Sequence, residues 1–191
     1  MWICTNYKVD WTAVAAAIAL WIWAHDTLRR RRERAASRRL LAQMMTKPFM
    51  EAEGEIALFR TSLVATFGNQ ASSQELANAT VAAREQFHSK ASRVKLDLPN
   101  QFIEKADLFD PSSSGRVANA FAQIGYLHRL WKLMSEPHED MDSDGMLLVG
   151  AAAFKQVTIT EEAIKDALGA MLKAGRLPWW LRIFKEKTPP P

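Results

Sequence analysis

The sequence feature that most constrains this chain is an apolar run from Trp11 to Ala24, which arginines follow closely. The run reads WTAVAAAIALWIWA and contains no charged residue. As a helix it would rise about 21 Å, which is less than the roughly 30 Å hydrocarbon core of a bilayer. A run of this length is compatible with a buried core helix, with the apolar part of an export signal, or with a short membrane span.

The flanking residues favour the membrane span. Trp11 at one end and Trp21 and Trp23 near the other resemble the aromatic belts found at membrane interfaces. Extending the helix to residues 9–28 adds only two charges, Asp10 and Asp26, each within a turn of an end. We therefore expect a single transmembrane helix over residues 9–28, preceded by a short non-cytoplasmic head at residues 1–8. An interfacial helix and a buried soluble helix are the alternatives.

Four consecutive arginines, residues 29–32, set the expected orientation. They follow the apolar run, whereas a cleaved signal peptide carries its positive charge before that run. The positive-inside rule then predicts that the N-terminus lies outside and the bulk of the chain in the cytoplasm. The predicted membrane-interface residues are Trp11, Trp21, Trp23, Arg29, Arg30, Arg31, Arg32, Trp179 and Trp180.

A resemblance covers about residues 10–40. The sequence DWTAVAA at residues 10–16 is followed by ALW at residues 19–21 and then by the arginines. This pattern resembles the N-terminus of small bacterial inner-membrane proteins of unknown function. The resemblance implies a single-span anchor in a bacterial inner membrane and implies no particular chemistry.

Charge is unevenly distributed along the chain. Residues 1–50 carry nine basic and three acidic residues, a net charge of +6, and the remaining residues carry a net charge of −2. The arginines lack the aromatic or polar neighbours that read nucleic-acid bases, so we expect no nucleic-acid partner. The single cysteine, Cys4, cannot form an intrachain disulfide.

Beyond the anchor the sequence predicts an all-α fold, because apolar residues recur with helical periodicity and alternation is almost absent. A basic juxtamembrane helix over residues 29–47 should continue the transmembrane helix and end at Pro48. An antiparallel helical bundle should follow over residues 48–177. Within it we expect helix boundaries at Gly68, at a capping box from Ser72 to Glu75, at Asp110-Pro111 and at Thr160.

The C-terminal tail, residues 178–191, carries two adjacent tryptophans, Trp179 and Trp180, among basic residues. This composition suits a membrane interface, where the rings lie among headgroups and the cations meet phosphates. The alternative is that the two rings cap the core of the bundle.

Asp140, Asp142 and Asp144, followed by Gly145, match the start of a calcium-binding loop. The twelfth position, where a bidentate glutamate should close the site, is Ala151. We therefore expect an acidic loop between helices and no cofactor, with calcium or another divalent cation as the weaker alternative.

The remaining residues suggest no catalytic site. The four histidines lack paired metal-ligand spacing, and no glycine-rich phosphate loop is present in the sequence. We expect a non-enzymatic module that binds the lipid bilayer and an unknown protein partner or a second copy of itself. The alternatives are a metal-dependent enzyme or regulator that uses residues 138–145, and an effector that perturbs membranes.

Overall fold

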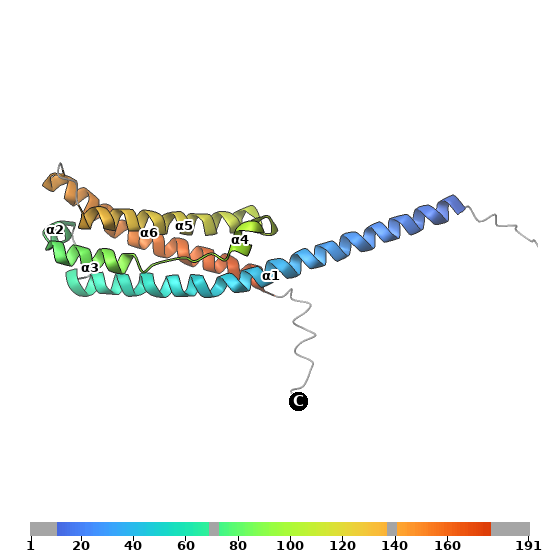
Figure 1. The fold of residues 1–191 in the computed structure, drawn as a ribbon, viewed down its shortest axis with the longest axis horizontal. Helices are drawn as coiled ribbons and strands as arrows, with labels where there is room; N and C mark the ends of the chain where they lie inside the picture. Colours follow the sequence, from blue (N-terminus) through green and yellow to red (C-terminus); the bar gives the residue numbers. More distant parts are fainter. Residues whose placement is uncertain (1–10, 69–72, 137–140, 177–191) are drawn as a thin grey trace, which may run out of the picture. The chain divides into compact units, whose positions relative to one another are not determined.

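The computed structural model describes residues 11–68, 73–136 and 141–176, in which all regular secondary structure is helical (Figure 1). The all-α prediction is confirmed for these residues. The elements are α1 (Trp11–Phe67), α2 (Ser73–Ala77), α3 (Val81–Ala91), α4 (Asn100–Glu104), the 3₁₀ helix η1 (Ala106–Leu108), α5 (Pro111–Ser135) and α6 (Ser143–Gly175). The chain divides into two compact units, Met1–Ser37 and Arg38–Pro191.

The described residues of the first unit, 11–37, form the N-terminal part of α1. Within the described residues, no helix combines the length and the apolar character that crossing a membrane requires. The transmembrane helix predicted over residues 9–28 is therefore not supported. The uncharged stretch is short, and the polar residues His25 and Asp26 end the apolar run directly after it, although the helix itself continues.

The second unit is a helical bundle, as the sequence predicts. Helix α5 and the part of α1 from Arg38 onward run in the same direction, and α3 and α6 run in the opposite direction (Figure 1). Helix α6 packs along α5 and also against α2, while α3 packs against α5. Antiparallel neighbours joined by short connections are the usual arrangement of such bundles.

An aromatic cluster forms the centre of the bundle core. The side chain of Trp131 on α5 is fully buried. Its ring centroid lies 5.0 Å from that of Phe59 on α1, 5.9 Å from that of Phe87 on α3 and 6.4 Å from that of Phe154 on α6. Burying rings of this size is the largest favourable contribution a small core can make, and edge-to-face pairs add to it. One tryptophan thus joins four helices.

The prediction that Pro48 ends the first helix is wrong, because α1 continues through Pro48 to Phe67. A proline inside a helix removes the hydrogen bond to the carbonyl four residues earlier, which belongs to Met44. Met44 is exposed, so water can reach this part of the helix, whereas Met45 and Phe49 on either side of the proline are fully buried. Burial of this face compensates for the lost hydrogen bond.

Two other predicted helices differ from the structure, although α2 begins at Ser73, inside the predicted capping box. The helix expected after the Ser72–Glu75 capping box breaks at residues 78–80, and α3 restarts with Thr80 as its N-cap. Thr160 was expected to start the last helix but lies inside α6, where it is fully buried. Its hydroxyl donates to the backbone oxygen of Gln123 at 3.3 Å, so a contact with α5 replaces the capping role.

Asp110 caps α5, as predicted. Its carboxylate accepts hydrogen bonds from the backbone amide of Ser113 at 2.9 Å and from the Ser113 hydroxyl at 2.7 Å. Pro111 follows at the first helical position, where its missing N–H costs nothing. This cap fixes the start of α5 at one end of the bundle.

Candidate functional site

The most unusual surface in the structure is the N-terminal aromatic segment, which we define as residues 11–28 of α1. Its large apolar side chains are exposed on all sides of the helix, and the exposed fraction reaches 77% for Trp11 and 69% for both Trp21 and Trp23. The other exposed large apolar residues of the segment are Val14, Ile18, Leu20, Ile22 and Leu28. Contiguous apolar surface of this kind usually marks a binding site for a protein or a membrane.

The predicted interface arginines directly follow this segment on the same helix. Arg29 pairs with Glu33 at 2.9 Å and Arg30 with Asp26 at 2.8 Å, each one helical turn apart. The hydrogen bond with Glu33 raises the pKa of Arg29, so this guanidinium stays charged. Arg31 and Arg32 are exposed and make no ion pair within the described ranges. Their positive charge is therefore available to a partner.

The acidic residues 142 and 144 lie at the start of α6. The carboxylate of Asp142 accepts the backbone N–H of Gly145 at 2.7 Å and so serves as the N-cap, and Asp144 lies in the first turn. Because the chain is helical from Ser143 onward, these residues do not form an open loop. Among the described residues, no group of three or more His, Cys, Asp or Glu side chains could hold a metal ion. Asp140 lies outside those residues.

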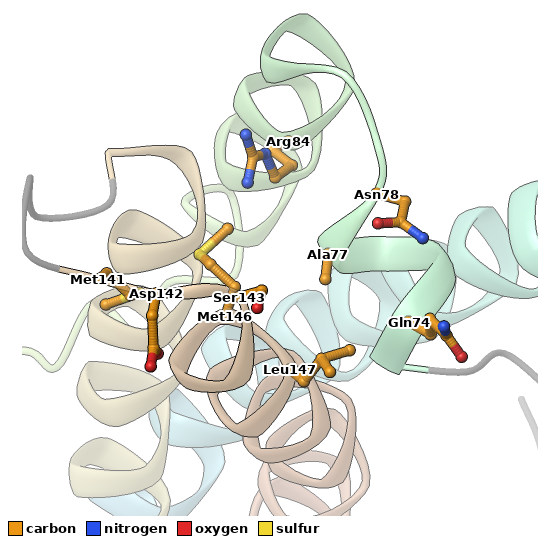
Figure 2. Close-up of a pocket in the computed structure, with 9 residues that line it drawn as sticks. All are labelled: Gln74, Ala77, Asn78, Arg84, Met141, Asp142, Ser143, Met146 and Leu147. Carbon is orange, nitrogen blue, oxygen red and sulfur yellow. The ribbon is translucent and has the colours of Figure 1, made fainter.

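A cavity of about 490 Å³ lies beside this helix start, between α2, α3 and α6 (Figure 2). Figure 2 shows Arg84 of α3 at one edge, and Asn78 and Gln74 at another. The Nε atom of Arg84 is buried and has no hydrogen-bond partner in the described part of the chain. The lining residues are Gln74, Ala77, Asn78, Arg84, Met141, Asp142, Ser143, Met146 and Leu147. Neither histidine nor cysteine belongs to this set of described lining residues.

A second cavity, of about 350 Å³, lies at the opposite end of the bundle, and we call it the basic cavity. It is lined by Arg38, Asp110, Ser112, Ser113, Arg116, Ala170, Lys173 and Ala174, from α1, the start of α5 and the end of α6. Sequence reasoning identified Asp110 as a helix cap but missed this cavity. No local sequence pattern indicates it, because its three basic residues, Arg38, Arg116 and Lys173, are separated by 78 and 57 residues along the chain.

Within the described residues, the histidines lie in separate environments. The Nε2 atom of His128 lies 2.9 Å from the backbone oxygen of Val94, and His25 stacks on Trp21. His88 is half-buried on α3, and its Nδ1 atom has no partner within the described residues. Cys4, His138 and the predicted interface residues Trp179 and Trp180 lie outside the described residues.

Comparison with known protein families, with curated proteins and with solved structures finds no match to this chain.

Proposed function

We propose that this chain is a non-enzymatic helical module attached to the cytoplasmic face of a bacterial inner membrane, where its bundle binds a partner protein or a second copy. The observation that carries the proposal is the exposure of Trp11, Trp21 and Trp23, together with aliphatic neighbours, around a helical segment that four arginines directly follow. Leaving this apolar area in water would cost about 25 cal/mol for each Å². A bilayer would remove that cost.

The distribution of apolar residues around the helix favours insertion over lying flat on the membrane surface. A helix that lies at the surface usually has one polar face, whereas residues 11–24 carry no charged residue on any face. In the spanning form of the proposal, residues 9–28 cross a locally thinned bilayer, with Trp11 at one interface and Trp21 and Trp23 at the other.

The arginines favour a membrane over self-association as the partner of this segment. In a parallel assembly of such helices, Arg29 to Arg32 of each copy would be brought close to the same residues of the next copy. Like charges at that distance repel, whereas anionic headgroups attract each arginine by about 1 kcal/mol. Asp142 is the N-cap of α6 and Asp144 lies in the first turn of that helix, so we do not propose the metal-dependent alternative.

Flotation with phospholipid vesicles tests the attachment. The full chain should float with vesicles that contain phosphatidylglycerol, and Ile18→Asp combined with Ile22→Asp should abolish flotation. Both isoleucines are exposed, so the bundle should be unaffected. The matched control is Leu148→Asp, which changes an even more exposed apolar residue on α6. Equal flotation of the double variant and the wild type would refute the proposal, and release of a trapped dye by the wild type would favour a membrane-perturbing effector.

The single cysteine provides a test of the spanning form. Cys4 precedes the segment, so an impermeant maleimide should label it from outside intact spheroplasts. In Cys4→Ser combined with Leu148→Cys, the new thiol on the bundle should stay protected until the membrane is opened. Protection of Cys4 in intact spheroplasts would contradict the N-outside orientation.

A further inference from the structure

The basic cavity contains more positive charge than its own carboxylate can neutralise. Arg38, Arg116 and Lys173 line it together with a single acid, Asp110, which leaves a net charge of +2. No carboxylate within the described residues lies within 4.0 Å of any of the three cations. Asp110 is itself occupied by the amide and the hydroxyl of Ser113. The cations are therefore free to bind an anion.

The side chain of Arg38 gives the most direct indication that a hydrogen-bond acceptor binds in the cavity. Its Nε atom is buried, and no acceptor for it exists among the described residues. Buried donors are nearly always hydrogen-bonded, because leaving one unsatisfied destabilises the folded state. An anion in the cavity would supply the acceptor, and the planar fork of an arginine fits the oxygens of a phosphate.

The helix start adds neutral donors beside the cations. Ser112 and Ser113 belong to the first turn of α5, a helix of 25 residues whose N-terminus carries partial positive charge. In that turn Pro111 has no N–H, and the amides of Ser113 and Ser114 bond to Asp110. Ser112, which carries an amide and a hydroxyl donor, lines the cavity beside them. Such donors are typical of phosphate-binding sites.

We propose that the basic cavity binds a phosphate group, presented either by an anionic phospholipid headgroup or by a small soluble phosphate. Its volume of about 350 Å³ suits a phosphate group and a few further atoms. Arg38 and Arg116 hold the phosphate oxygens, Lys173 contributes charge from the last turn of α6, and Ser112 donates from the start of α5. The lipid form rests on the membrane attachment proposed above, whereas the soluble form does not.

The first arm of the test measures binding of inorganic phosphate to the full chain in a phosphate-free maltoside detergent. Calorimetric titration at constant ionic strength should give saturable binding, with a Kd on the order of 1 mM for so small an ion. Arg116→Gln should weaken it about tenfold, as expected for the loss of one charge-assisted hydrogen bond. Arg116 is exposed, so this variant should fold normally.

Two further variants make the result specific. Asp110→Asn keeps a good helix cap but removes the one negative charge of the lining, so it should tighten phosphate binding. Lys155→Gln removes an exposed lysine of α6 that does not line the cavity, so it should leave Kd unchanged. An equal loss of affinity in Lys155→Gln and Arg116→Gln would mean diffuse electrostatics and would overturn the proposal.

The second arm identifies the source of the phosphate. If flotation on phosphatidylglycerol vesicles weakens in Arg116→Gln but not in Lys155→Gln, the ligand is a lipid headgroup. If flotation is unchanged while inorganic phosphate still binds the wild type, the ligand is a soluble phosphate. Absence of saturable phosphate binding together with unchanged flotation overturns the site, even where the Ile18→Asp, Ile22→Asp result upholds membrane attachment.

Discussion

Asp110 connects the local start of α5 with the charge of the basic cavity. The hydroxyl and the amide of Ser113 lower the pKa of its carboxyl group, and Arg38 adds a smaller attraction. A carboxyl group whose pKa is lowered by folding stabilises the folded state above its unfolded pKa, which is about 3.9. That stabilisation is lost as the pH falls through the lower, folded pKa.

We therefore predict a pH-dependent difference between the wild type and Asp110→Asn. In phosphate-free buffer, the wild type should have the higher Tm at pH 7, and the difference should shrink below about pH 4 as the carboxylate is protonated. Thermal unfolding of both proteins between pH 7 and pH 3 measures it. A Tm difference that does not change over this range would contradict the assigned hydrogen bonds.

Gly68 and Gly169 illustrate opposite roles of the same residue type. Gly68 follows α1 with a φ of +78°, and its amide donates to the Val64 oxygen at 2.8 Å, which is a typical helix end. Gly169 lies inside α6, and no atom lies within 4 Å of the position that a Cβ would take. A side chain would therefore strain the backbone at residue 68 but would fit without a clash at residue 169.

The corresponding prediction is a pair of opposite effects. Gly169→Ala should raise the free energy of unfolding by up to about 1 kcal/mol, because alanine favours the helix. Gly68→Ala should lower it by about 1 kcal/mol, because L residues disfavour this backbone region. Urea denaturation of both variants measures the changes, and a shift of the same sign in both would contradict the backbone geometry at Gly68.

At the scale of elements, α1 is longer than its sequence suggests, because tertiary packing keeps the chain helical through Pro48. Pro48 normally ends or kinks a helix, but Met45 and Phe49 beside it are fully buried in the bundle.

Pro48→Ala should raise the free energy of unfolding by about 1–3 kcal/mol, since it restores the hydrogen bond to Met44. Lys47→Ala, at the exposed neighbouring position, is the matched control and should change stability little. Destabilisation by Pro48→Ala in urea titration would show that the proline is adapted to this helix.

The sequence predicted the helical class and several element boundaries because these depend on neighbouring residues. The cap at Asp110-Pro111 and the stop at Gly68 follow from local backbone chemistry, and both were found where expected. Thr160 was misjudged because its hydroxyl bonds to Gln123 on another helix. The basic cavity could not be predicted, because it depends on how the start of α5 and the end of α6 meet the middle of α1.

At the scale of the whole molecule, the tryptophans have two different environments. Trp131 is fully buried among Phe59, Phe87 and Phe154, whereas Trp21 is 69% exposed in the other unit. Trp131→Ala should therefore lower the free energy of unfolding by about 3–5 kcal/mol. Trp21→Ala should leave it within about 0.5 kcal/mol of the wild type. Chemical denaturation of the two variants followed by circular dichroism measures this contrast, and a similar loss in both would contradict the division into two units.

The same contrast gives the protein an optical label for each unit. In a variant with Trp2, Trp179 and Trp180 replaced by phenylalanine, Trp131 should emit at short wavelength because water cannot reach its indole. Trp11, Trp21 and Trp23 should emit at long wavelength in buffer and shift to shorter wavelength when a bilayer surrounds them. An aqueous quencher such as iodide would then dim only these three, and the fluorescence that survives would report the state of the bundle.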